Sequence, residues 1–256
     1  MAGYIKKQGD YVLPLSSSSD NVVKREKGNS GAKAIMPLAI KYARKVAGFP
    51  FVEGVYLSGS LSKNYFDEKS DIDFFIITKP GRLWLCRSFI ILKYKLLRPS
   101  KRKYWCPNYF ITSDDLKIPD MNAFTGTELA FLLPVVNYQL YKCLLEKNSW
   151  YKLRYPNKKL ANDNSVAPRY SPLKVLEFFF SGRLGNLIDN LLLEATLKRW
   201  RKKYPLLSDT SFELQFRSRK NVCKRHSHGF QNKVLLKWAE KTRQFEEEHN
   251  VSMNWI

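Results

Sequence analysis

The chain has 256 residues, enough for one large domain or two modest ones, and 44% of them are hydrophobic, as in ordinary globular proteins. It contains no stretch of about 18 uncharged apolar residues, so the sequence predicts no membrane-spanning helix, and its N-terminal segment lacks the apolar core of a signal peptide. The four cysteines lie far apart without metal-ligand spacing, so we expect free thiols and a cytoplasmic location.

Positive charge is the unusual feature of the composition. The chain carries 44 Lys and Arg residues against 23 Asp and Glu residues, which gives a net charge of +21. Residues 82–103 contain eight basic residues and no acidic one, and residues 198–225 contain ten basic residues against two acidic ones. Such surfaces attract nucleic acids, nucleotide phosphates or anionic lipid headgroups. A solvated basic face without a ligand is an equally good interpretation of the charge taken alone.

The first part of the chain predicts a segment without regular structure and then a helix. Residues 1–31 lack hydrophobic periodicity and are expected to form a mobile N-terminal segment. The apolar spacing that follows predicts a helix ending near Gly48. Because proline is tolerated in the first turn of a helix, this helix is expected to start close to Pro37.

Three strands are predicted next. Residues 51–59 are expected to form a strand closed by a glycine turn, and residues 71–78 a second strand after a short helical start. Residues 82–97 predict either a core helix with a basic edge or a membrane-surface helix, and the core helix is favoured because it would cover the sheet. Residues 103–112 are the third strand, and Pro107 indicates an edge position or a bulge.

Helical patterns dominate from residue 121 onward. Residues 122–148 predict one helix, with Thr125 and Glu128 as a capping box. The polar stretch 154–172 is expected to be a loop or linker, and a long helix over residues 172–204 is expected to kink at Gly182 or Gly185. A last helix is predicted near residues 229–248. The whole pattern predicts an α+β protein, with a small mixed-sheet unit followed by an α-helical domain.

Two aspartates stand out in the second predicted strand. Residues two apart in a strand project from one face, so Asp71 and Asp73 are expected to point the same way. Two carboxylates held so close repel each other unless a cation lies between them. Oxygen ligands suit Mg²⁺ or Mn²⁺, which proteins bind through one or two carboxylates together with substrate phosphates.

The stretch before the aspartates fits a phosphate ligand. At Gly59 the missing side chain allows backbone N–H groups to approach a phosphate closely, and Ser60 adds a hydroxyl donor. A helix that begins there would present its N-terminus to the same anion. Lys63 would add a point charge toward a triphosphate.

The order of these residues resembles the nucleotidyltransferase superfamily of DNA polymerase β type. Gly59-Ser60 is followed by ten residues and then by Asp-Ile-Asp, with Ser70 in front of the acidic pair. Further segments look like those of a bacterial group of nucleotidyltransferase-domain proteins of unassigned substrate. These segments are residues 106–112, 124–134 and 148–157.

The resemblance covers roughly residues 50–160 and implies a nucleotidyltransferase domain, which we place at residues 32–120. A helical domain over residues 121–256 is predicted from the hydrophobic pattern alone. The resemblance further implies metal-dependent transfer of a nucleoside monophosphate from an NTP, such as ATP, to an acceptor hydroxyl with release of pyrophosphate. Asp71 and Asp73 would hold the divalent ions. The nucleotide-binding residues would be Gly59, Ser60, Lys63 and Ser70. Nucleic-acid ends, small alcohols and protein hydroxyls all suit this chemistry as acceptors.

One departure from the family pattern concerns a third carboxylate. Active members usually carry it on a neighbouring strand, where this chain has Asn108, which can ligate a metal ion but cannot accept a proton. Asp114, Asp115 and Glu53 are alternative acids, each with a turn or strand-edge role as the competing interpretation. The hypotheses are therefore an active nucleotidyltransferase and a catalytically impaired, basic nucleic-acid-binding module. A third is attachment of residues 82–103 to an anionic membrane.

Three further side chains carry open interpretations. His226 and His228 follow Cys223 in a basic stretch and either contact phosphate or form a polar loop before the last helix. Trp200, inside a run of basic residues, either stacks on a base or anchors its helix against the core.

Overall fold

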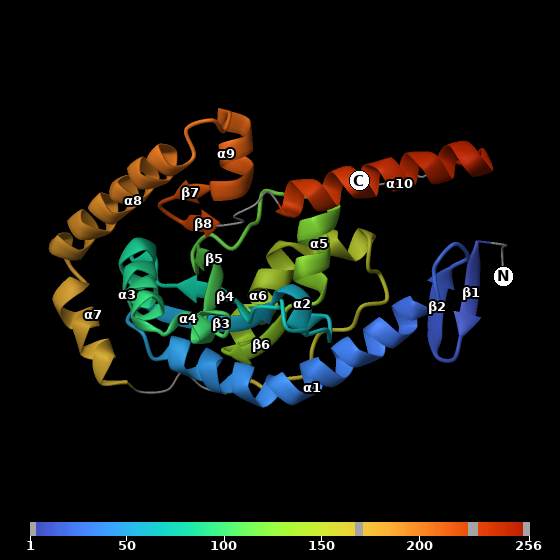
Figure 1. Cartoon of the computed structure of the whole chain (residues 1–256). Helices are drawn as coiled ribbons and strands as arrows, with labels where there is room; N and C mark the ends of the chain where they lie inside the picture. Colours follow the sequence, from blue (N-terminus) through green and yellow to red (C-terminus); the bar gives the residue numbers. More distant parts are fainter. Residues whose placement is uncertain (1–3, 167–170, 225–229, 253–256) are drawn as a thin grey trace.

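A computed structural model describes residues 4–166, 171–224 and 230–252 of the chain. At its centre lies a six-stranded sheet in which β4 and β5 run parallel and the other neighbours run antiparallel (Figure 1). In spatial order the strands are β6 (Leu133–Val136), β3 (Val52–Ser58), β4 (Asp73–Thr78), β5 (Cys106–Thr112), β8 (Val222–Lys224) and β7 (Ser218–Arg219). This mixed sheet with its flanking helices confirms the predicted α+β class.

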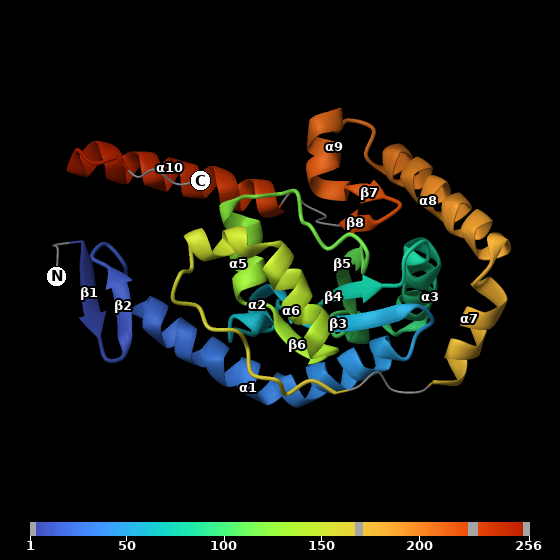
Figure 2. The ribbon, with the colours of Figure 1, turned by 180° about the vertical axis from the view of Figure 1, so that it is seen from behind.

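Helices cover both faces of the sheet. The first are α1 (Asp20–Ala47), α2 (Gly59–Ser62), α3 (Leu83–Leu96), α4 (Pro99–Arg102), α5 (Ala123–Ala130) and α6 (Tyr138–Lys147). Then follow the 3-10 helices η1 (Ser149–Leu153) and η2 (Pro172–Lys174), and α7 (Val175–Phe180), α8 (Arg183–Lys203), α9 (Asp209–Phe216) and α10 (Phe230–His249). One core joins α1, α3, α8 and α9 to the sheet, and the other joins α5 and α6 to its opposite face, as the view from behind shows (Figure 2).

Alternation along β4 explains how one strand serves two cores. Phe74 and Ile76 lie in the first core, and Phe75 and Ile77 in the second, since successive side chains point to opposite faces. A strand buried on both faces is apolar throughout, which is why the run after Asp73 shows no polar alternation.

The helix α1 begins 17 residues before Pro37, at Asp20, so the predicted start near Pro37 is wrong. Its first half is held by tertiary contacts that hydrophobic periodicity does not reveal. The carbonyl of Gly28 accepts a hydrogen bond from the backbone N–H of Phe66 at 3.0 Å, and a side chain at Gly28 would collide with the Tyr65 ring. Arg25 donates to the carbonyl of Lys63 at 2.6 Å.

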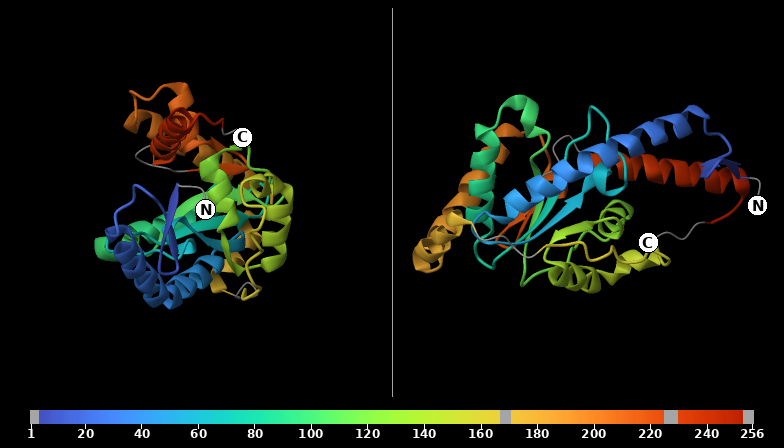
Figure 3. Two further views of the ribbon diagram at one scale, coloured as in Figure 1. Left: turned by 90° about the vertical axis from the view of Figure 1, so that its right-hand side faces the viewer. Right: turned by 90° about the horizontal axis from the view of Figure 1, so that it is seen from below.

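A hairpin precedes α1, formed by β1 (Ile5–Gln8) and β2 (Tyr11–Pro14). Figure 3 shows α10 and α1 both reaching toward this hairpin, and the Tyr4 ring lies 5.1 Å from the Phe245 ring of α10. The described part of residues 1–31 is thus helix and hairpin, while its mobility stays a prediction.

The helix predicted over residues 122–148 is wrong, because the structure divides it into α5, β6 and α6. Pro134 lacks the N–H that a helix requires and lies instead in β6, the edge strand that pairs with β3. The predicted capping box is also wrong, since α5 begins after Asn122, whose side chain accepts a hydrogen bond from the Thr125 N–H. Glu128 is therefore free of a capping role.

Residues 172–204 form the short 3-10 helix η2 and the helices α7 and α8, with a break at Gly182 where a kink was predicted. The side chain of Arg82 explains the break, because its guanidinium donates to the carbonyls of Phe180, Ser181 and Gly182. Those carbonyls point at Arg82 rather than along a continuous helix.

The sheet also takes strands from beyond residue 120, since β6, β7 and β8 all follow it. The division of the chain into domains at residue 120 stays a prediction.

The favoured core-helix interpretation of residues 82–97 agrees with α3, which buries Leu83, Trp84 and Ile90. Of the two positions predicted for Pro107, the structure shows the bulge and not the sheet edge, because β5 has a neighbouring strand on each side. No helix of the described ranges is long and apolar enough to cross a membrane.

Asp189 is expected to stabilise the packing of α8 against α3. It is fully buried, and its carboxylate accepts from the backbone N–H of Leu85 at 2.9 Å and from the Lys220 ammonium at 2.8 Å. Asp189→Ala leaves the Leu85 N–H buried without a partner, so urea denaturation should show a free energy of unfolding lower by about 2 kcal/mol. The control Glu194→Ala, at an exposed position on the same helix, should change it by less than about 0.5 kcal/mol. Equal losses would contradict this role of Asp189.

Candidate functional site

A cleft of about 1020 Å³ opens where β3 ends and β4 begins. All seven residues predicted for the site line it, although they come from a loop, a helical turn and two strands. They are Gly59, Ser60, Lys63, Ser70, Asp71, Asp73 and Asn108. The structure thus brings the sequence-based candidates together on one surface.

Asp73 is the first residue of β4 and pairs with Ser58 at the end of β3. The next residue, Gly59, has a φ of +66°, a conformation that other residues rarely adopt. A Cβ atom at Gly59 would lie 2.2 Å from an oxygen of the Asp73 carboxylate. Glycine is therefore required here both for the turn and for the space that Asp73 occupies.

The environment of Asp73 disfavours its charged form. Burial raises the pKa of Asp73 to about 7, and the charges of Glu128 and Asp71 act in the same direction. A hydrogen bond from the Cys106 side chain and the Lys63 ammonium oppose the rise without cancelling it. Nearby positive groups do not fully stabilise the charged form of this carboxylate, and a divalent cation would stabilise it further.

Asp71 lies in front of β4 rather than within it, so the strand argument for a shared face does not apply to it. It nevertheless lines the same cleft and is exposed. Partial burial raises the pKa of Asp71, and the nearby Lys103 ammonium opposes this rise. The pair thus combines one partly buried and one exposed carboxylate.

Asn108 owes its position to a bulge in β5. Pro107 pairs with Phe74 and Tyr109 pairs with Phe75, so Asn108 is an extra residue without a partner on β4. A bulge re-aims side chains and is common next to active sites. Here it turns the Asn108 amide into the cleft, while the neighbouring Trp105 and Tyr109 lie in different cores.

Lys63 and Gly59 share a partner that the sequence did not reveal. The Glu128 carboxylate accepts from the Gly59 N–H at 3.0 Å and from the Lys63 ammonium at 2.8 Å. Lys63 also donates to the Gly59 carbonyl at 2.8 Å. The only sequence signal for Glu128 was its place inside the resembling segment 124–134, and the capping-box interpretation obscured it.

Two serines of the predicted set have different surroundings. Ser60 belongs to α2, which is a single turn of four residues, so the predicted helix N-terminus contributes local N–H groups rather than a long helix dipole. Ser70 donates to Asp67 at 2.7 Å and accepts from the Asp67 N–H at 3.1 Å, which shapes the loop at the rim of the cleft.

The alternative acids lie elsewhere. Asp114 and Asp115 follow the end of β5, and Glu53 lies near the start of β3. Because β4 and β5 are parallel and β3 is antiparallel to β4, all three lie at the edge of the sheet opposite Asp73. They therefore do not complete the site.

Trp200 packs in the core against Phe216 at 5.1 Å between ring centroids, which favours its anchoring role over base stacking. His226 and His228 lie outside the described residues.

The far wall of the cleft is apolar and was not predicted. It is formed from α10 by Phe230, Val234, Leu235 and Trp238. The Arg154 guanidinium lies 4.9 Å from the centre of the Trp238 ring. Helical spacing places these α10 residues on one face, but the sequence does not say what that face packs on.

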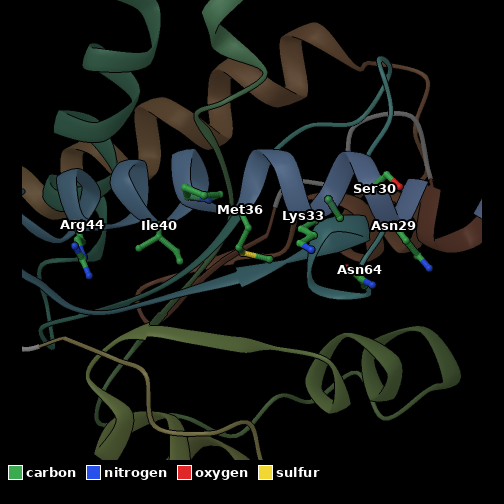
Figure 4. Close-up of a pocket in the computed structure, with 9 residues that line it drawn as sticks. Asn29, Ser30, Lys33, Met36, Ile40, Arg44 and Asn64 are labelled. Atoms are coloured by element: carbon green, nitrogen blue, oxygen red, sulfur yellow. The ribbon is translucent and has the colours of Figure 1, made fainter. Parts of the chain in front are cut away.

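A second hollow, of about 820 Å³, runs along α1 (Figure 4). Lys33, Arg44, Met36 and Ile40 are among its lining side chains. No Asp or Glu belongs to the described residues that line it, so it offers no acidic metal ligand.

The donor set of the main cleft suits a hard divalent cation. Asp71 and Asp73 supply carboxylate oxygens and Asn108 an amide oxygen, which are ligands that Mg²⁺ prefers. Among residues 4–166, 171–224 and 230–252 no group of three His, Cys, Asp or Glu side chains is arranged to hold a metal ion. Magnesium sites with one or two carboxylates rely on substrate phosphates for further ligands, and this set fits that type.

Gly59→Ala tests the contact with Asp73, and Gly9→Ala is its matched control. Both glycines have positive φ, but a Cβ at Gly9 meets no atom within 4 Å. Gly9→Ala should lower the free energy of unfolding by about 1 kcal/mol, the cost of a left-handed conformation. Gly59→Ala should cost about 2 to 4 kcal/mol, because overpacking against Asp73 adds to it. Denaturant melts measure both, and equal losses would contradict the close approach.

Comparison with known proteins gives one match. Residues 40–125 match the family model described as the nucleotidyltransferase domain. This segment runs from α1 to α5 and includes Gly59, Asp73 and Asn108. No curated protein and no solved structure matches the chain significantly. The match confirms the predicted resemblance to the polymerase β-like nucleotidyltransferase superfamily over residues 40–125.

Proposed function

We propose that the protein transfers a nucleoside monophosphate from an NTP to an acceptor hydroxyl in a metal-dependent reaction. The observation that carries the proposal is the cleft in which Asp71 and Asp73 face the Gly59-Ser60 turn and Lys63. A buried carboxylate with raised pKa beside backbone and ammonium donors suits a site for a cation and a phosphate chain together.

The reaction needs few protein groups beyond those in the cleft. The acceptor hydroxyl loses its proton to solvent and its oxygen forms a bond to the α-phosphorus. The bond from that phosphorus to the bridging oxygen breaks, and pyrophosphate leaves with the electron pair. Gly59, Ser60 and Lys63 would hold the phosphates, with Ser70 shaping the rim. Positioning and charge stabilisation supply most of the catalysis in such transfers.

Divalent ions, Mg²⁺ or Mn²⁺, would be held by Asp71 and Asp73, with the Asn108 amide oxygen as a further donor. When bound, such ions offset the charge that develops on the attacking and leaving oxygens. The contribution of the chain itself is to keep Asp73 partly buried and Asp71 accessible on the same cleft.

The proposed acceptor is a compound with a hydroxyl group. The cleft is large enough for a nucleotide and a small acceptor together, and its α10 wall offers Phe230 and Trp238 as flat apolar surfaces. A nucleic-acid end is the acceptor that the net charge of +21 favours.

A second candidate function is a nucleic-acid-binding module that has lost the chemistry. Two observations favour it, namely Asn108 in place of a carboxylate and the exposed cations of α8 near its C-terminal end, such as Arg199 and Lys202. This function would use basic surfaces and not the acidic pair.

The enzymatic proposal predicts that Asp71→Ala and Asp73→Ala each abolish Mg²⁺-dependent release of pyrophosphate. The loss should exceed about a hundredfold, since each carboxylate would ligate the ion directly. A coupled pyrophosphate assay with the four common NTPs, in the presence of an RNA oligonucleotide or a mixture of polyols, measures it. Asp114→Ala, at the exposed opposite edge of the sheet, is the matched control and should retain activity.

Turnover that survives in both aspartate variants would contradict the proposal. If instead no variant turns over, and the double aspartate variant binds RNA at about 50 mM salt with an affinity that falls as salt is added, the binding module is the correct function.

A further inference from the structure

Glu128 occupies a position that its role in the fold does not require. It projects from α5 into the cleft, where its two oxygens engage the Gly59 N–H at 3.0 Å and the Lys63 ammonium at 2.8 Å. The N-terminus of α5 is already capped by Asn122. The carboxylate therefore serves the Gly59 turn rather than its own helix.

The two donors that hold Glu128 form a small anion-binding site. A backbone N–H and an ammonium converge on one carboxylate, and Lys63 is fixed over the turn by its bond to the Gly59 carbonyl. Carboxylate and phosphate oxygens take the same donors at similar distances. The Glu128 carboxylate thus occupies the place that a phosphate group of a ligand could take, in a site that opens to the cleft.

This carboxylate is accessible and weakly held. The side chains of Lys63 and Glu128 are 25% and 26% exposed, so a ligand in the cleft can reach both. An ion pair that is partly solvated contributes about 1 kcal/mol or less. A triphosphate carries several negative charges and would compete effectively for the same donors.

Glu128 also lies close to the acidic pair. Both carboxylates adjoin Gly59, since its N–H donates to Glu128 at 3.0 Å and a Cβ atom on it would lie 2.2 Å from an oxygen of Asp73. Held by Gly59 and Lys63, Glu128 is not part of any three-residue metal-ligating group in the part of the chain that the structure describes. Its release would add a carboxylate next to Asp73.

We propose that Glu128 is the third carboxylate of the site, retained by Gly59 and Lys63 in the nucleotide-free protein and released toward the metal ion when the phosphates of an NTP take these two donors. The inference rests on the proposed function for the identity of the anion. It accounts for the site having Asn108 on the neighbouring strand, because the additional acid comes from α5 instead.

Binding of inorganic tripolyphosphate without metal tests the first half of the proposal. Isothermal titration calorimetry in EDTA should show that Glu128→Gln binds tripolyphosphate about tenfold more tightly than the unchanged protein, since a charge-assisted competitor has been removed. Glu68→Gln is the matched control, because it removes the same charge from an exposed position near the rim and should change the affinity by less than about twofold.

Binding of Mn²⁺ tests the second half. With a non-hydrolysable ATP analogue present, electron paramagnetic resonance should show Mn²⁺ bound about tenfold more weakly by Glu128→Gln than by Glu68→Gln, because one ligand is lost. The two measurements should therefore change in opposite directions for one substitution. Glu128→Ala should repeat both results, and thermal melts establish that each variant is folded.

Each measurement can overturn one half of the proposal. Equal or weaker tripolyphosphate binding by Glu128→Gln, or no binding by any variant, would overturn the competition of Glu128 with phosphate, and unchanged Mn²⁺ affinity would overturn the metal role. Neither measurement requires turnover. Failure of the proposed function, seen as no pyrophosphate release in the unchanged protein, is therefore distinguishable from failure of this inference.

Discussion

The rest of the site depends on the burial of Asp73 against Gly59. A residue other than glycine would place its Cβ 2.2 Å from the Asp73 carboxylate. Burial raises the pKa of Asp73 to about 7, so the folded protein binds this proton more tightly than the unfolded chain. In the absence of metal, the contribution of Asp73 to the free energy of unfolding is therefore expected to be greatest below about pH 4. This contribution should fall as the pH rises toward 7. A bound cation would offset this cost, which couples folding to the proposed chemistry.

The scaffold around Asp73 divides the cleft into two chemically different sides. The Gly59 turn, Lys63 and the bulged Asn108 form a polar side on the end of the sheet. The helix α10 forms an apolar side with Phe230 and Trp238, although it follows the matched domain by about a hundred residues in the sequence. Nucleotide phosphates suit the first side and a ring or base suits the second.

Local signals made the polar side predictable from the sequence. The Gly59-Ser60 pair, the acidic pair and the run of apolar residues after Asp73 are all short-range patterns, and the structure gathers them in one cleft. Tertiary contacts determined what the sequence could not show. The first half of α1 is held by Phe66 and Tyr65, and helical spacing over residues 122–148 concealed β6 because Pro134 fits an edge strand. Glu128 was missed since its partners lie 65 or more positions away.

Asp73 is a partly buried carboxylate whose charged form a divalent cation would stabilise. Carbon-13 NMR of the aspartate side chains, assigned with Asp73→Asn, measures its titration directly. We expect a midpoint near 7 in EDTA and a much lower midpoint once Mg²⁺ and a non-hydrolysable NTP are present. A midpoint near 4 in EDTA, or one that Mg²⁺ and the nucleotide leave unchanged, would contradict this description of Asp73.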